Sequence, residues 1–195
     1  MFSCSSDGGS GSSNNSGVAY IKGDLDGTAF NYTVTETSTD YFYNYLSGYS
    51  ALDFDRWYYY GGSFYTPTFT PTISIAWDNM VHTDSEATET TMFYDAFNTI
   101  PTNYLTEDES NNLYLKGVDI QYENEAGVFY NTMYGSQAGS TFTVTSSSEG
   151  IEEGGTLQTK TISGTYSCKL YNSNDRTDFL TVTNGSYKVI IREYN

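Results

Sequence analysis

The stretch "DFLTVTNGSYKVIIREYN", residues 178–195, contains the strongest fold signal in the chain. Apolar and polar residues alternate on both sides of Asn184-Gly185, as they do in a β-strand with one buried face. Asn-Gly is also the dipeptide most typical of a two-residue hairpin turn, because both turn residues need a positive φ. The stretch therefore predicts a β-hairpin that turns at Asn184-Gly185.

The stretch just before it, "KTISGTYSCKLYN" at residues 160–172, alternates in the same way and predicts another strand. Its apolar face carries Ile162, Gly164, Tyr166, Cys168 and Leu170. A cysteine on such a face behaves as a small buried hydrophobe. We therefore expect Cys168 to be neither a nucleophile nor a metal ligand.

Further strands are predicted toward the N-terminus. "VAYIKGDLDGTAFNYTVTE", residues 18–36, alternates after Asp26-Gly27, which is another hairpin dipeptide. "RWYYYGGSFYTPTFTPTISIAW", residues 56–77, predicts two strands that are separated by Gly61-Gly62 and edged by prolines.

The middle of the chain continues the pattern. Residues 118–122 and 128–132 alternate on either side of the turn "ENEAG". "STFTVTS", residues 140–146, predicts a strand, and we expect "SSSEGIEEGGT", residues 146–156, to be an acidic glycine-rich loop.

One segment has the helical period instead. Phe93, Ala96, Phe97 and Ile100 recur at i, i+3, i+4 and i+7. Thr83 and Glu86 have the spacing of a capping box, and Pro101 follows as a stop signal. The pattern predicts one short α-helix near residues 85–98 that packs on a sheet.

Composition agrees with an all-β fold. The chain has 20 Tyr and 11 Phe among 195 residues, and only three prolines interrupt it. Abundant aromatic residues and threonines favour strands. We expect residues 18–195 to form a single domain of about ten antiparallel strands, either a β-sandwich or a β-barrel, with the one helix.

The charge limits the classes of partner. Eight Lys and Arg against 24 Asp and Glu give a net charge of −16. A chain this acidic has little with which to neutralise phosphates, which argues against nucleic acid and anionic lipid as partners. No apolar run is long enough to span a bilayer as a helix.

The aromatic residues are the candidates for ligand contacts. Strand alternation in residues 56–60 sends Arg56, Tyr58 and Tyr60 to one face and Trp57 and Tyr59 to the other. One set is exposed if that strand lies on a solvated sheet, and exposed aromatic rings bind sugars or protein partners. The alternative is that these residues belong to a tyrosine-rich core. The candidate contacts are Trp57, Tyr58, Tyr59, Tyr60, Tyr41, Tyr43 and Tyr45.

No motif indicates catalysis or a resident metal. His82 is the single histidine, and "GYSAL" at residues 48–52 is the nearest approach to a nucleophile elbow but lacks the final glycine. "DLDGT" resembles part of a calcium loop but fits a hairpin better. The acidic loops "TEDESNN" and "EGIEE" are either solvated, which is the default interpretation, or weak calcium sites. We expect no catalytic residue, metal or cofactor.

The first residues suggest a location. Met1-Phe2-Ser3-Cys4 resembles the end of a bacterial lipobox, in which signal peptidase II leaves a lipidated cysteine at the mature N-terminus. Ser5, Ser6 and Asp7 resemble the export signal of surface-exposed Bacteroidota lipoproteins. Residues 1–17 then comprise a lipobox remnant, an export signal and a flexible Ser/Gly tether, and residues up to Asn195 the β domain.

The globular part adds a second resemblance. "AYIKGDLDGTAFNYT" at its start, with "ISGTYSCKLYN" and "LTVTNGSYKVII" at its end, resembles small Bacteroidota surface lipoproteins of a domain-of-unknown-function family. The resemblance implies an all-β fold and an outer-membrane location with the domain facing the cell exterior. It brings no catalytic residue that matches this chain.

Three functions follow as expectations. The first is a non-catalytic binding module for a glycan or an outer-membrane protein complex, held at the membrane through a lipid on Cys4. The second is a lipocalin-like carrier of a small ligand, which needs a closed barrel with an unfilled apolar interior. The third, least favoured, is an envelope hydrolase that uses His82 or loop acids.

Overall fold

A computed structural model describes residues 19–35, 39–40, 42–52, 55–82, 89–107, 115–151 and 155–193. The predicted anchor, export signal and tether (residues 1–17), the capping pair Thr83 and Glu86, and the candidate contact Tyr41 lie outside the described residues.

Ten strands and one α-helix make up the described fold. In chain order the elements are β1 (Ala19–Leu25), β2 (Thr28–Val34), β3 (Phe42–Leu52), β4 (Asp55–Tyr65), β5 (Thr72–His82), α1 (Glu89–Ala96), β6 (Gly117–Glu123), β7 (Phe129–Asn131), the 3₁₀ turn η1 (Thr132–Tyr134), β8 (Thr141–Ile151), β9 (Gln158–Asn172) and β10 (Phe179–Arg192). The predicted all-β class with a single short helix is confirmed.

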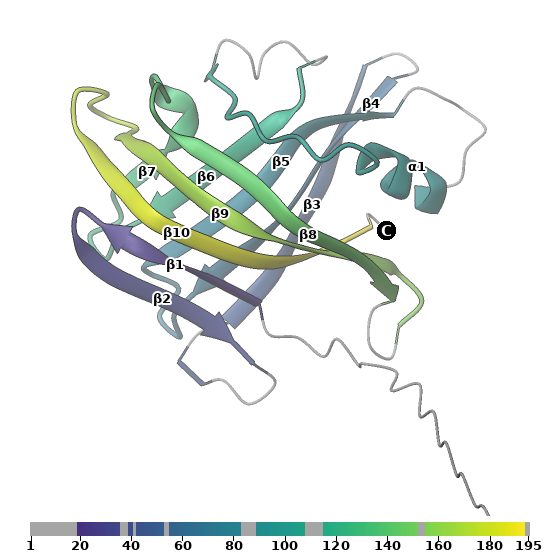
Figure 1. Ribbon diagram of the computed structural model, residues 1–195, viewed down its shortest axis with the longest axis horizontal. Helices are drawn as coiled ribbons and strands as arrows, with labels where there is room; N and C mark the ends of the chain where they lie inside the picture. Colours follow the sequence, from purple (N-terminus) through teal and green to yellow (C-terminus); the bar gives the residue numbers. More distant parts are fainter. Residues whose placement is uncertain are drawn as a thin grey trace, which may run out of the picture.

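The strands form one strongly curled antiparallel sheet, in the order β2-β1-β10-β9-β7-β6-β5-β4-β3, with β8 paired to β9 beside β7. Figure 1 shows β3, β4 and β5 passing behind β8, β9 and β10, so that the sheet encloses a common interior. Of the two predicted architectures, the sheet is therefore barrel-like.

A side chain closes the barrel where no strand ladder does. β10 continues past the end of β1, and the backbone of Ile190 there meets β3 from the opposite end of the sheet. The Tyr43 hydroxyl donates to the Ile190 carbonyl at 2.6 Å and accepts from the Ile190 N–H at 3.0 Å. Ile190 is in register with Thr161 of β9, and the one hydroxyl satisfies both of its backbone groups.

The predicted turn at Gly61-Gly62 is wrong. β4 runs through both glycines, and the chain reverses later, at the two prolines between β4 and β5. A Cβ on Gly62 would come within 2.0 Å of the Tyr43 hydroxyl, and one on Gly61 would come within 2.2 Å of the Ile75 carbonyl. The glycines are needed for close approach inside the barrel rather than for a turn.

The predicted hairpin at Asn184-Gly185 is also wrong. β10 continues through the dipeptide, which forms a β-bulge against both β9 and β1. Asn184 has a positive φ of 52°, as the dipeptide predicts, but only to accommodate the extra residue. The bulge changes which residues face inward, from Val182 before it to Tyr187 after it.

The turn at Asp26-Gly27 is confirmed, with φ values of 47° and 80° between β1 and β2. The turn "ENEAG" is confirmed between β6 and β7. The predicted loop at residues 146–156 is shorter than expected, because β8 continues to Ile151 and pairs there with Gln158 of β9.

The helix α1 lies at one end of the barrel, and Phe93, Ala96 and the following Phe97 are buried there as their spacing predicts. Lys160 of β9 is buried beside the end of the helix and donates to the Phe97 carbonyl at 3.2 Å. No described helix is long and apolar enough to cross a membrane.

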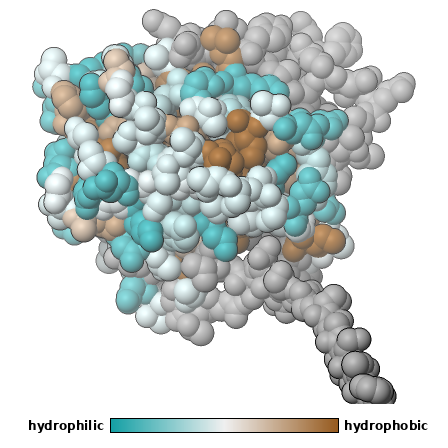
Figure 2. Space-filling view, viewed as in Figure 1, coloured by the Kyte–Doolittle hydropathy of each residue, from teal (hydrophilic) through white to brown (hydrophobic). Residues whose placement is uncertain are grey.

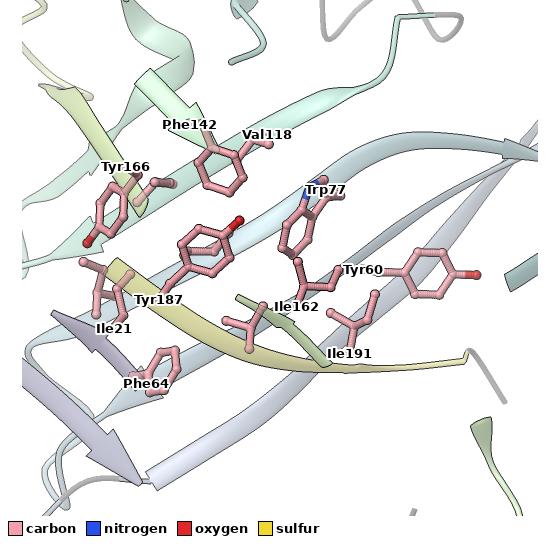
Figure 3. Close-up of a cluster of buried hydrophobic side chains, with 14 of the residues drawn as sticks. Ile21, Tyr60, Phe64, Trp77, Val118, Phe142, Ile162, Tyr166, Tyr187 and Ile191 are labelled. Atoms are coloured by element: carbon pink, nitrogen blue, oxygen red, sulfur yellow. The ribbon is translucent and has the colours of Figure 1, made fainter. Parts of the chain in front are cut away.

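Aromatic rings fill the barrel interior (Figure 3). Tyr187 of β10 is stacked on Phe142 of β8, with ring centroids 4.9 Å apart, and lies 6.3 Å from Trp77 of β5. Tyr60, Phe64 and Ile191 are buried in the same cluster. Cys168 is buried and unbridged among these residues, as expected from its place on the apolar face of β9.

We expect Tyr43→Phe to lower the free energy of unfolding by about 1–3 kcal/mol, because it leaves the Ile190 N–H and carbonyl without their common partner. Chemical denaturation measures the change. Tyr65→Phe is the matched control, since that hydroxyl donates a long hydrogen bond, 3.3 Å, to the Asn44 side chain, whereas the Tyr43 hydroxyl bonds the β10 backbone. Equal effects of the two substitutions would contradict the role of Tyr43 in closing the barrel.

Candidate functional site

The structure divides the predicted aromatic contacts. Tyr58 and Tyr60 are each 2% exposed and belong to the core, whereas Tyr59 between them is 43% exposed. The alternation expected for this strand is confirmed at these three positions, and Tyr43 closes the barrel. Nothing is described of the side chains of Trp57 and Tyr45. The seven candidates therefore do not form one exposed patch.

A different aromatic pair is exposed further along. We call residues 65–72, "YTPTFTPT", the aromatic loop; it connects β4 to β5. Phe69 at its tip is 69% exposed, and its ring stacks on that of Tyr65 with centroids 5.3 Å apart and planes only 5° apart. The prediction focused on the consecutive aromatic residues 56–60 and missed this pair.

Phe69 also has a positive φ of 68°. This conformation costs a bulky residue on the order of 1–3 kcal/mol, and glycine or asparagine adopts it more easily. The Phe69 N–H donates to the Thr66 carbonyl at 2.8 Å, and the Thr72 hydroxyl donates to the Phe69 carbonyl at 3.1 Å. The loop therefore holds an unfavourable residue in a defined position.

The second candidate surface is a cleft of about 420 Å³ at one end of the barrel, which we call the end cleft. It is lined by Thr106, Glu107, Met133, Tyr134, Gly135, Ser136, Gln137 and Arg176. These residues come from the segment after α1, from η1 and the turn that follows it, and from the connection between β9 and β10.

Part-buried hydrogen bonds hold the wall of the end cleft. The Gln137 amide group donates to the carbonyls of Thr132 and Lys169 at 2.8 and 2.7 Å. The Tyr171 hydroxyl donates to the Ser136 carbonyl at 2.7 Å. The turn after η1 is thus attached to β9 at several points, and the cleft is preformed.

The end cleft contains an ion pair. Arg176 Nη1 lies 2.6 Å from Glu107 Oε2, and about half of each side chain is exposed. The guanidinium also lies 5.1 Å from the centre of the Tyr134 ring. A planar cation beside an aromatic ring can bind carboxylates, amides or carbonyls of a partner.

Beneath the cleft wall lies a buried carboxylate that the sequence reasoning did not predict. Asp119 of β6 is fully buried on the outer side of the barrel, where its carboxylate accepts hydrogen bonds from Gln121, Asn131 and Thr132 at 2.6, 3.2 and 3.0 Å. Asn131 and Thr132 come directly before or within η1. Asp119 therefore connects β6 to the base of the end cleft.

Asp78 of β5 is half-buried near Asp119, at a β-bulge of its strand. Burial and the Asp119 carboxylate raise the pKa of Asp78 from 3.8 to about 7. Burial likewise raises the pKa of Asp119, although its three hydrogen bonds oppose the rise. Neither acid lines the end cleft. The pair therefore lies outside the lining of the cleft, and only Asp119 is hydrogen-bonded to η1.

The candidates for catalysis and metal binding form no described site. "GYSAL" lies within β3, and His82 lies two strands away in β5, where nothing is described of its side chain. Asp24 lies in β1, and Asp26 lies in the confirmed hairpin turn. Burial raises the pKa of the Cys168 thiol. Among the described residues no group of three His, Cys, Asp or Glu could hold a metal ion. Of the two acidic loops, only Thr106, Glu107 and residues 149–151 are described.

Comparison of the chain with models of known protein families, with curated proteins and with solved structures finds no match.

We expect the stability of the protein to fall as the pH rises from about 4 to about 7, because the folded state keeps the Asp78 proton that the unfolded chain has already released. The loss is complete above the folded pKa and absent below the ordinary one. Asp78→Asn should remove roughly 2–4 kcal/mol of this pH dependence. Denaturant unfolding of both proteins at pH 4 and pH 8 measures it, and parallel profiles would contradict the assignment.

Proposed function

We propose that the protein is a lipid-anchored, non-catalytic binding module of the bacterial cell surface, whose partner is a glycan or an outer-membrane protein complex. The observation that carries the proposal is the filled interior. Trp77, Phe142 and Tyr187 occupy the space in which a carrier would hold its ligand. This packing favours a binding module over the lipocalin-like carrier, and it leaves contact with a partner to the outer surface.

The end cleft suits such a contact. Its volume of about 420 Å³ lies in the range of sites that hold a small ligand or part of a larger partner. The cleft is rigid, since its wall is attached to β9 and, through Asp119, to β6. Arg176 and Tyr134 are of the residue types that dominate binding energy at protein interfaces.

The position of the cleft is compatible with a membrane anchor. In Figure 1 the connection between β9 and β10 lies at the upper left, whereas β1, which follows the tether, begins near the lower middle. A lipid on Cys4 would leave the cleft end free to meet a partner. Stable anchoring needs more than one acyl chain, as the lipobox resemblance of residues 1–4 implies.

The anchor is tested by metabolic labelling with a fatty acid that carries a detectable group, in a bacterial host that processes lipoproteins. The gene is expressed with the signal peptide that the lipobox requires. We expect label on the wild-type protein and on Cys168→Ala, and none on Cys4→Ala. Label that persists in Cys4→Ala would exclude the proposed attachment point.

The end cleft is tested by mild-detergent co-purification from the native membrane. We expect Arg176→Ala to reduce recovery of a stoichiometric partner or glycan about tenfold, which corresponds to roughly 1.4 kcal/mol. Lys22→Ala is the matched control, because Lys22 is an exposed cation 5.0 Å from the centre of the Tyr20 ring. Undiminished recovery with Arg176→Ala would show that the partner contacts a surface other than the end cleft.

A further inference from the structure

The aromatic loop presents Phe69 in a way that the fold does not require. Phe69 is the most exposed of the large hydrophobic residues in the described part of the chain, at 69%. Hydrogen bonds from Thr66 and Thr68 to the Thr70 carbonyl, at 2.7 and 3.0 Å, hold the tip in shape. The ring is therefore presented to solvent by an ordered loop.

Two features of this position work against stability. The positive φ of Phe69 favours glycine or asparagine, and an apolar ring in water gains little from folding. The stacking on Tyr65 offsets only part of these costs. Phe69 thus costs stability through its backbone conformation and through its exposed ring, yet hydrogen bonds hold it in place. Such strain is typical of residues that contact a ligand or a partner.

The surroundings of the ring indicate the class of ligand. Tyr65 covers one face of the Phe69 ring, which leaves the opposite face available. Residues 65–72 contain no charged and no aliphatic side chain apart from two prolines, and four of the eight residues are threonines. The neighbouring Asn44 accepts a hydrogen bond from the Tyr65 hydroxyl at 3.3 Å.

A sugar ring matches this surface. The C–H groups on one side of a pyranose carry partial positive charge and are attracted to the negative face of an aromatic ring. Its hydroxyls can pair with threonine and asparagine. A membrane surface would call for basic residues beside the ring, and these are absent from residues 65–72. We propose that the aromatic loop is a saccharide-binding site in which a neutral sugar stacks on Phe69.

The inference rests on the proposed role as a binding module but not on the lipid anchor or the end cleft. The test is affinity electrophoresis of the full 195-residue chain through native gels that contain starch, xylan, galactomannan or a β-glucan. Polygalacturonate serves as the anionic comparison. The variants are Phe69→Ala, Phe69→Leu and Phe69→Trp.

We expect at least one neutral polysaccharide to retard the wild-type protein. Phe69→Ala and Phe69→Leu should weaken the interaction at least fivefold, whereas Phe69→Trp should retain it. Phe179→Ala is the matched control and should bind as the wild type does, because Phe179 is also exposed and its ring also contacts a tyrosine, Tyr171, at 5.4 Å.

Failure of all four neutral polysaccharides to retard the protein would overturn the inference, as would equal retardation of the wild type and Phe69→Ala. Binding that Phe69→Leu retains would indicate a protein-like apolar contact and would also overturn it. Phe69→Gly provides an independent check: its thermal midpoint should equal or exceed that of the wild type. A clear drop would show that the ring serves the fold. The Arg176→Ala co-purification is scored separately, so either proposal can fail alone.

Discussion

The Tyr43 hydroxyl connects β3, one end of the curled sheet, to β10 by bonding both backbone groups of Ile190. The glycines of β4 make room for this contact, since a side chain at Gly62 would overlap the hydroxyl. Once β3 is held against β10, the inward side chains of all the intervening strands must share one enclosed volume. Aromatic rings fill that volume, and their mutual contacts position β8, β9 and β10 around Tyr187.

Because side chains fill the barrel-like interior, the binding that we propose involves the outer surface. The end cleft and the aromatic loop are both built by connections between strands, and hydrogen bonds to the framework hold both in place. Burial and the Asp119 carboxylate together raise the pKa of Asp78. Groups with perturbed pKa values are enriched near functional sites.

The sequence predicted correctly those features that depend on neighbouring residues, such as one hairpin turn and the helix. Asp26-Gly27 turns where it should, because β1 and β2 are adjacent in both sequence and space. Phe93 and Phe97 are buried because a helical spacing brings them to one side. Asn184-Gly185 has the same turn chemistry as Asp26-Gly27, but pairing of β10 with both β9 and β1 outweighs it and the dipeptide becomes a bulge. The sequence did contain a signal for this bulge: the apolar residues of β10 that face the core lie at even positions up to Val182 and at odd positions from Tyr187 onward.

The candidate surfaces were harder to predict for a related reason. Asp119 is one acid in an alternating strand, and only the return of η1 over β6 buries it. Arg176 and Glu107 lie far apart in the sequence, so their ion pair depends on the assembled barrel. The sequence around Phe69 shows only an aromatic residue between two prolines; its positive φ and its exposure are features of the folded loop. A single sequence reports local preference, and these sites depend on contacts between distant segments.

Side chains pack the barrel interior, and we propose that binding takes place on the outer surface. Titration of the protein with a fluorescent fatty acid, followed by energy transfer from tryptophan, distinguishes the two locations. Trp77 lies in the core, so a ligand in the interior would accept its emission efficiently. We expect no saturable signal. Saturable, stoichiometric transfer that an unlabelled fatty acid reverses would contradict the proposal.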